Sequence, residues 1–270
     1  MKLLFSEHKP DYGHYIFPYA IWGVPEPGET PADFFDAGFL PSSRNLDRFY
    51  LCRQVRVDLK RYKPSSENRR ILRKGKDISA ILVPRDKFDY SAQRRQFFKT
   101  YADIKFGKDT MDYARLDSLF SGSITSHLLV FTDGASGEEV GTVMLYLESD
   151  TVAYYYYAFY DLKYYQRNLG MYLMTSAVEL FSSKGFRHVY LGSCYNQNAL
   201  YKTQFAGAEF FNGVRWSRNL KELKYLIKHS EQEATHHLLE TEEYRELFGG
   251  EVAEMAAASR FHVPLPKPVR

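Results

Sequence analysis

Cysteine is scarce in this chain of 270 residues, which has only Cys52 and Cys194. Two cysteines cannot build a disulfide framework or a cysteine-rich metal site. No internal repeat or low-complexity stretch is evident. Apolar residues make up 44% of the chain, which suffices for a buried core and excludes a disordered protein.

Long apolar runs are also missing. The apolar run within residues 1–9 is too short for a signal peptide, and no segment approaches the length of a membrane span. We therefore expect a cytoplasmic protein that does not insert into a membrane.

The usual nucleophilic and metal-binding arrangements are absent as well. No Ser-His-Asp or Cys-His pattern recommends itself, and Cys194 ends an apolar stretch, where a cysteine is more often a packing residue than a nucleophile. His236 and His237 are adjacent rather than four residues apart, so they make a poor pair of metal ligands. The sequence predicts no metal site.

Charge is unevenly distributed, although the net charge is only +3. Residues 44–108 contain 19 lysines and arginines against 7 acidic residues, and the rest of the chain is acidic. A basic region of this kind favours an extended anionic partner, of which nucleic acid is the first candidate. A solvated basic face is the alternative.

The stretch with the clearest secondary-structure signals is residues 152–205. Residues 152–160 are β-branched and aromatic and predict a strand, and residues 171–181 have helical apolar spacing closed by Lys184-Gly185. A second strand at 188–194 and a second helix at 196–205 follow. In such a unit the strands are normally parallel, and the amino-terminal end of the crossing helix is a ready anion site.

Two interpretations of the loop before that helix remain open. The first is an ordinary connection in which Gly170 allows close packing. The second is an acyl-donor loop similar to Gln/Arg-x-x-Gly-x-Gly/Ala of the GNAT superfamily. Arg167 and Gly170 match that pattern, but Tyr172 replaces its second small residue and is expected to crowd a diphosphate. Tyr172 at this position argues against an acyl-CoA donor but is compatible with a GNAT-like fold.

The order of predicted elements gives the fold class. Helices are predicted at 30–38, 67–76, 87–105 and 113–120, and strands at 48–58, 127–131, 140–148 and 209–216. This order predicts an α+β fold, with a GNAT-like mixed sheet flanked by helices and a small amino-terminal α/β domain packed on it. The predicted domains are a basic amino-terminal domain (1–85), a catalytic domain (86–220) and a helical acidic carboxyl-terminal extension (221–270).

Short segments in one order carry a resemblance to a known family. Residues 61–74, RYKPSSENRRILRK, resemble the family segment RFxPSxSQRRVLRK, and residues 157–161 and 167–172 are similar to YxFYDP and RSLGxY. Residues 190–192, 199–202 and 214–216 are similar to YLGYWI, KMxYK and GxW. The chain thus resembles the arginyl-tRNA–protein transferase family, which includes the bacterial aspartate/glutamate leucyltransferases, over roughly residues 33–217.

The resemblance implies an enzyme that takes an aminoacyl group from a charged tRNA. It places that group on the α-amine of a protein's amino-terminal residue, typically an acidic one. The implied co-substrate is aminoacyl-tRNA, with no other cofactor. The family's C-x-x-C-R-x-C cluster is present only as Cys52, so iron–sulfur or metal binding is not expected, and Cys52→Ser is expected to retain activity.

The candidate catalytic residues lie at the end of the strand predicted at 152–160 and within the helix predicted at 196–205. Asp161, at the end of the strand, is the candidate for contacting or deprotonating the amine, with a turn cap as the alternative. Tyr201 and Lys202 are candidates for holding the tRNA 3′ terminus or the ester carbonyl, with a surface helix pair as the alternative.

The candidate binding residues lie in three segments. The basic helix offers cations for tRNA phosphates or an acidic acceptor side chain, so Arg70→Ala is expected to weaken the use of one of them. The loop at 167–170 and the aromatic strand at 152–160 provide the other candidates. An aromatic ring of that strand is expected either to stack on the terminal adenine of the tRNA or to belong to the core. The predicted binding residues are Arg69, Arg70, Arg73, Lys74, Tyr157, Arg167, Asn168 and Gly170.

Two other functions remain open at this point. An acyl-CoA-dependent N-acyltransferase shares the predicted fold and takes acetyl-CoA as its co-substrate. A catalytically inactive relative keeps the basic surface and binds tRNA without transferring its amino acid.

Overall fold

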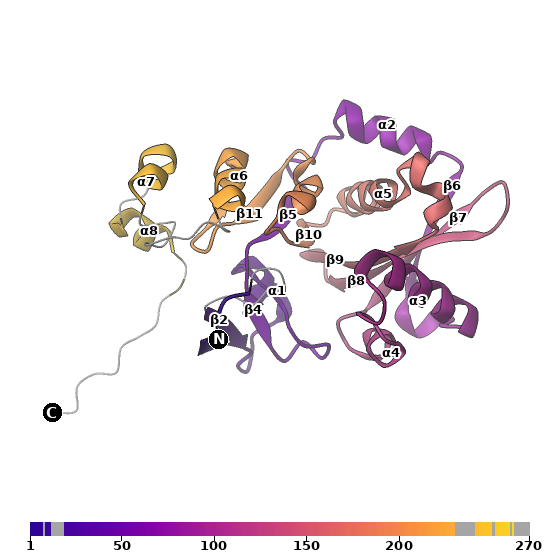
Figure 1. The fold of residues 1–270 in the computed structure, drawn as a ribbon, viewed down its shortest axis with the longest axis horizontal. Helices are drawn as coiled ribbons and strands as arrows, with labels where there is room; N and C mark the ends of the chain where they lie inside the picture. Colours follow the sequence, from indigo (N-terminus) through magenta and orange to yellow (C-terminus); the bar gives the residue numbers. More distant parts are fainter. Residues whose placement is uncertain (8, 12–18, 230–240, 250–251, 260, 262–270) are drawn as a thin grey trace.

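A computed structural model describes residues 1–7, 9–11, 19–229, 241–249, 252–259 and 261 (Figure 1). Its larger sheet has eight strands in the order β12-β11-β5-β10-β9-β8-β7-β6. These strands are β5 (Gln54–Asp58), β6 (Ile78–Pro84), β7 (His127–Asp133), β8 (Glu139–Glu148), β9 (Val152–Tyr160), β10 (His188–Ser193), β11 (Ala208–Phe211) and β12 (Trp216–Ser217). Neighbours are antiparallel except β9 and β10, which are parallel as the sequence predicts.

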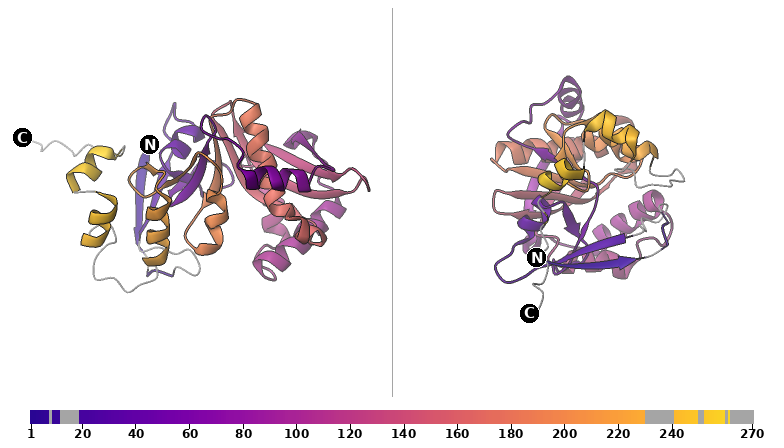
Figure 2. Two further views of the ribbon diagram at one scale, coloured as in Figure 1. Left: turned by 90° about the horizontal axis from the view of Figure 1, so that it is seen from above. Right: turned by 90° about the vertical axis from the view of Figure 1, so that its left-hand side faces the viewer.

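Helices cover both faces of this sheet (Figures 1 and 2). On one face lies α5 (Leu169–Ser183), which connects β9 to β10 and carries α2 (Ser66–Lys74) on its outer side. On the other face lie α3 (Ala92–Phe106) and α4 (Tyr113–Ser121). The predicted α+β architecture, a mixed sheet flanked by helices with a meander leading into one parallel crossover, is confirmed.

A smaller sheet packs beside the larger one. Its strands pair in the order β1-β2-β4-β3, with bounds Lys2–Glu7, Tyr19–Val24, Phe49–Leu51 and Phe39–Pro41, and α1 (Pro31–Asp36) lies against it. Phe34 and Phe49 are stacked under this sheet, whereas the ring of neighbouring Phe35 reaches Tyr154 and Tyr190 of the large sheet at 5.2 and 4.9 Å between centroids. Adjacent phenylalanines on α1 thus join the two sheets.

The predicted boundary at residue 85 does not coincide with the division between the sheets. Both β5 and β6 precede residue 85, yet they lie in the large sheet. The division falls between β4 and β5, since β4 pairs within the small sheet and β5 pairs with β10 and β11. The separate folding of domains 1–85, 86–220 and 221–270 stays a prediction.

Two predicted helices differ in kind or extent. Residues 196–205 form a 3-10 helix, η4 (Gln197–Thr203), rather than an α-helix. The helix predicted from residue 87 begins at Ala92, because Ser91 caps it by accepting a hydrogen bond from the Arg94 N–H, and residues 85–87 form a separate 3-10 turn. Helix α2 begins as predicted, where Ser65 and Asn68 exchange backbone and side-chain hydrogen bonds at 3.0 and 3.1 Å.

The carboxyl-terminal region is helical but is not simply a solvated extension. It contains α6 (Leu220–His229), α7 (Glu242–Phe248) and α8 (Val252–Ala258). Leu223 and Leu226 of α6 are buried in the main core. Glu222 is also buried, where its carboxylate accepts hydrogen bonds from Asn212, Ser217 and Tyr244. Three neutral donors replace the water that this carboxylate loses, which allows Glu222 to be buried on the inner side of α6.

Some sequence predictions for this region fall on segments outside the described residues. These predictions concern the helical character of residues 230–240 and the pair His236-His237. In the part of the chain that the structure describes, no helix combines the length and apolarity required to cross a bilayer.

A buried ion cluster joins α1, β5 and β11. The guanidinium of Arg56 contacts the carboxylates of Asp36 and Glu209, each at 2.9 Å, and lies 3.8 Å from the ring centre of Trp216. The Trp216 indole N–H donates to the Asp36 carbonyl at 2.8 Å. The side chains of Arg56 and Glu209 are only 9% and 8% exposed, so neither charge is compensated by water.

His188, at the start of β10, makes stability depend on pH. Burial and the nearby charges of Arg56 and Arg187 lower its pKa to about 3, so the folded chain holds it neutral while the unfolded chain protonates it near pH 6.5. Lowering the pH from 7 to 5 is expected to cost about 2 kcal/mol of the free energy of unfolding through this residue. Urea unfolding of His188→Gln at both pH values checks this, and an unchanged pH dependence in the variant would contradict it.

Candidate functional site

Strands β9 and β10 separate at the centre of the large sheet. Their parallel pairing ends at Tyr154 and Tyr190, although β9 continues to Tyr160 and β10 to Ser193. Beyond Tyr190, β10 stays with β5 after a register shift before Gly192. We call this place, beginning at Tyr155 of β9 and Leu191 of β10, the strand divergence.

A bulge in β9 lies at the strand divergence. Met144 of β8 pairs with Tyr157, but the next residue, Leu145, pairs with Tyr155, which leaves Tyr156 as an extra residue. A bulge of this kind bends the strand and redirects side chains. Aromatic contacts accordingly place both Tyr156 and Tyr157 on the α3 and α4 side of the sheet, whereas Tyr155 packs in the core under α5.

The amino-terminal end of α5 lies against the end of β9. A Cβ added to Gly170 would lie 2.7 Å from the hydroxyl oxygen of Tyr160, so the close approach requires glycine. Asn168 precedes the helix with φ 57° and ψ 39°, is exposed, and makes no side-chain cap. The first N–H groups of α5 therefore lie beside Tyr160, at the end of β9 that follows the strand divergence. The side chain of Arg167 lies outside the described residues.

Asp161 follows β9 directly and takes part in a turn. Its carboxylate accepts a hydrogen bond from the Lys163 N–H at 2.9 Å, and its own N–H donates to the Val140 carbonyl at 2.9 Å. This is the geometry of the turn cap that the sequence left open as the alternative. Its role toward an amine stays a prediction.

Lys202 brings a positive charge to the far end of β10. Its ammonium donates a hydrogen bond to the Ser193 carbonyl at 2.7 Å, and a Cβ on Gly192 would lie 3.6 Å from it. Burial lowers the pKa of Lys202, and the nearby Cys194 and Cys52 sulfurs oppose that change. Tyr201 beside it is 46% exposed. The predicted pair Tyr201-Lys202 thus lies at the strand divergence, on the β10 side.

The basic helix α2 presents its cations to solvent close to α5. Arg69, Arg73 and Lys74 are exposed, and Arg69 and Arg73 line a groove with Ser66 and Leu72. Arg70 differs, because its guanidinium forms a double hydrogen bond with Glu67, one turn earlier on the helix. The positive charge of α2 is therefore partly neutralised within the helix.

Tyr172 joins α2 to the first turn of α5. Its ring is buried against Gly75, where a Cβ would lie 2.3 Å from the ring, and its hydroxyl donates to the Ile78 carbonyl at 2.9 Å. The expectation that this ring crowds a diphosphate is not what the geometry shows, because the ring fills the α2–α5 interface. The same contact brings Arg73 and Lys74 next to the amino-terminal end of α5.

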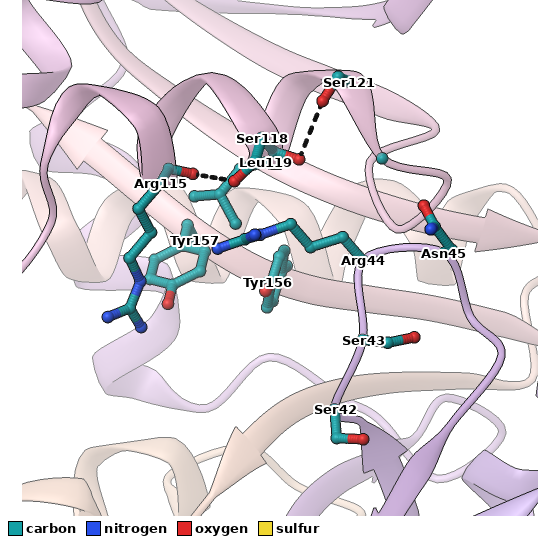
Figure 3. Close-up of a pocket in the computed structure, with 11 residues that line it drawn as sticks. Ser42, Ser43, Arg44, Asn45, Arg115, Ser118, Leu119, Ser121, Tyr156 and Tyr157 are labelled. Carbon is teal, nitrogen blue, oxygen red and sulfur yellow. Dashed lines mark hydrogen bonds between the residues drawn. The ribbon is translucent and has the colours of Figure 1, made fainter.

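A cavity of about 530 Å³ opens on the opposite face of the sheet (Figure 3). We call it the arginine pocket; its lining comprises residues 42–45, Arg115, Ser118, Leu119, Ser121, Gly122, Tyr156 and Tyr157. Tyr157, predicted to bind the tRNA end, lies here with Tyr156 at the β9 bulge and not beside Gly170. The candidate residues are therefore divided between the two faces of the sheet.

The two cysteines are both free and buried. Burial raises the pKa of the Cys52 thiol to about 12, with hydrogen bonding to Tyr50 and the charge of Lys202 acting in the opposite direction. A thiol with this pKa is almost entirely protonated near neutral pH and is a poor nucleophile. Within the described residues no group of three or more potential metal ligands gathers.

The structure brings together residues that sequence patterns do not connect. Gly170 lies against Tyr160 at the end of β9, next to Asp161, whereas Tyr201 and Lys202 lie at the end of β10. Arg44 and Arg115 of the arginine pocket were missed, because each lies in a segment with no motif and they meet only through the fold. A register shift such as the one at Tyr156 leaves no sequence signal either.

Relatives of known name match about three fifths of the chain. A protein called aspartate/glutamate leucyltransferase in Sinorhizobium medicae is 27% identical over 182 residues, which cover 62% of this chain and 69% of that protein. One of the same name in Pseudoalteromonas atlantica is 27% identical over 175 residues, covering 61% and 71%. The resemblance to this group of transferases is confirmed. No protein-family model matches the chain.

Solved structures give weaker similarities. The carboxyl-terminal domain of a putative lysylphosphatidylglycerol synthetase from Agrobacterium fabrum aligns with a TM-score of 0.43 at 13% identity, covering 83% of this chain and 59% of that one. FemX aligns with a TM-score of 0.38 at 8% identity, covering 53% and 52%. Both TM-scores are below 0.5, so neither similarity assigns a function.

Proposed function

We propose that this relative of the aspartate/glutamate leucyltransferases moves an amino acid from a charged tRNA to the amino-terminal α-amine of a protein or peptide. The observation that carries the proposal is the strand divergence with a different surface on each side of it. On one side lie the amino-terminal end of α5 and the cations of α2, and on the other lies the arginine pocket. Two substrates can thus approach one point from opposite faces.

The α5 side suits the tRNA. Arg69, Arg73 and Lys74 are exposed on α2, and phosphate oxygens are the partners that such cations most often bind in nucleic acids. The N–H groups in the first turn of α5 add a partial positive charge beside Gly170. The 3′ end of the tRNA, with its ester-linked amino acid, then points into the strand divergence.

The reaction requires positioning more than a reactive side chain. The amine nitrogen bonds to the ester carbonyl carbon, the bond from that carbon to the ribose oxygen breaks, and a proton passes from the amine to the leaving oxygen. The aminoacyl ester is already activated, and an α-amine has a pKa of about 8, so a useful fraction is unprotonated at neutral pH. The ammonium of Lys202 is the charge we assign to the developing oxyanion.

A direct transfer assay tests the proposal. The full chain is incubated with tRNA charged with radiolabelled leucine and a peptide that begins with Asp, and label in the peptide is measured. We expect incorporation above a control without enzyme, and loss of incorporation when the peptide is amino-terminally acetylated, because no free amine remains. Absence of transfer from leucyl-tRNA and from a pool of all charged tRNAs would overturn the proposal.

The same preparation separates the alternatives. Calorimetric titration with acetyl-CoA tests an acyl-CoA N-acyltransferase, which Tyr172 does not oppose because its ring is buried in the α2–α5 interface. An inactive relative would instead bind tRNA, with an affinity that falls as salt rises, and transfer nothing.

A further inference from the structure

The arginine pocket contains two cations and no anion. Arg44 and Arg115 are exposed, and none of the eleven lining residues is aspartate or glutamate. Arg115 donates one hydrogen bond to the Thr110 carbonyl at 3.1 Å, and neither guanidinium forms a salt bridge with a carboxylate in the described parts of the chain. Figure 3 shows the Arg44 side chain extended across Tyr156 and Tyr157 toward Arg115.

Both charges lie near Tyr156. Burial raises the pKa of Tyr156, and the charges of Arg44 and Arg115 oppose that rise, which requires both guanidinium groups to lie near its hydroxyl. Two like charges over one aromatic floor repel each other, and the repulsion falls when an anion is bound between them.

The backbone that carries Arg44 is held in place. The Arg44 carbonyl accepts a hydrogen bond from the Ile124 N–H at 2.9 Å. A Cβ on Gly122 would lie 2.7 Å from both the Cβ and the carbonyl oxygen of Arg44, so these segments are in contact at the backbone. On the other side, Asp112 caps the start of α4 and fixes the turn that carries Arg115. The backbone segments that carry the two arginines are therefore in place before a ligand binds.

We propose that Arg44 and Arg115 bind the side-chain carboxylate of the acceptor's amino-terminal residue and so select an acidic acceptor. The inference rests on the proposed function, because it assigns the acceptor to this side of the strand divergence. Arginine suits the task, since its planar guanidinium binds a carboxylate through two parallel hydrogen bonds. With the carboxylate held there, the α-amine a few bonds away lies over the bulge at Tyr156.

Peptide binding without tRNA tests this assignment separately from transfer. Fluorescence anisotropy is measured with labelled peptides that begin with Asp, Asn or Lys, using wild type, Arg44→Gln and Arg115→Gln. We expect wild type to prefer the Asp peptide, and each variant to weaken its binding roughly tenfold or more while binding of the Asn peptide stays within about twofold. Lys221→Gln, an exposed cation on α6 at the far end of the large sheet, is the matched control.

Three outcomes would overturn the inference. Wild type that binds Asp and Asn peptides equally has no carboxylate selection. Variants that lose both peptides equally, with unchanged thermal unfolding, indicate a role in shaping the pocket. Variants that lose tRNA binding instead place nucleic acid in this pocket. Selective Asp-peptide binding that depends on both arginines supports the inference even when no transfer is detected, so failure of the proposed function remains distinguishable.

Discussion

Replacing Arg56 with alanine is expected to lower the free energy of unfolding by about 3–5 kcal/mol. The reason is the carboxylate of Glu209, whose side chain is 8% exposed and which loses its main cation at 2.9 Å. Asp36 loses the same partner, and Trp216 loses the guanidinium stacked on its ring. Because this cluster joins α1, β5 and β11, the loss should also separate the small sheet from the large one. Urea unfolding followed by far-UV circular dichroism measures it.

Two further variants show whether charge is the cause. Arg218 also contacts Glu209, at 3.2 Å, but its side chain is 55% exposed, so Arg218→Ala is expected to cost less than about 1 kcal/mol. The double change Arg56→Met with Glu209→Leu removes the more deeply buried of the two carboxylates, since Asp36 is 26% exposed, and should recover much of the loss. If the double variant is as unstable as Arg56→Ala, packing rather than charge holds the junction.

Replacing Lys202 with methionine is expected to lower the rate of aminoacyl transfer at saturating substrates by roughly 10²–10³-fold, the usual effect of removing one oxyanion donor. Methionine keeps much of the length of the side chain and removes only the ammonium, which lies at the strand divergence and donates to Ser193. The fold should be retained, because burial lowers the pKa of this lysine and its charge is already costly in the folded state. Single-turnover transfer assays and thermal unfolding measure the two effects.

Controls at other cations make this result specific. Lys224→Met, at an exposed position on α6, should transfer at the rate of the wild type. Lys202→Arg keeps the charge but cannot release a proton near neutral pH, so retained activity identifies charge stabilisation and lost activity points to proton transfer. A Lys202→Met variant with the full rate would leave this ammonium with only the structural role of capping β10.

Sequence patterns located the central elements well where local signals are strong. The strand at Val152–Tyr160 has the predicted bounds, because a run of β-branched and aromatic residues is unambiguous. The start of helix α2 is also set by a local signal, the capping box formed by Ser65 and Asn68. Strand β6 was missed because it is a largely exposed edge strand that pairs only with β7, so its residues show no buried alternation.

The candidate site could be predicted only in part. Gly170 and Lys202 carry motif signals, but the positions of Gly170 against Tyr160 and of Lys202 at the end of β10 appear only in three dimensions. By spacing, Arg70 looked equivalent to the neighbouring cations, but its guanidinium is already hydrogen-bonded to the carboxylate of Glu67, one turn away. Short-range spacing gives the positions of charges along a helix and does not say which of them are already paired.

The sequence by itself determined the kind of fold, the basic character of α2 and the relationship to the leucyltransferases, because each depends on residues close together in the chain. Only the tertiary structure decided where β9 and β10 part, and that Arg44 and Arg115 meet over Tyr156. These features join segments about seventy residues apart or depend on a one-residue register shift. They follow from how the whole core packs, so no local pattern encodes them.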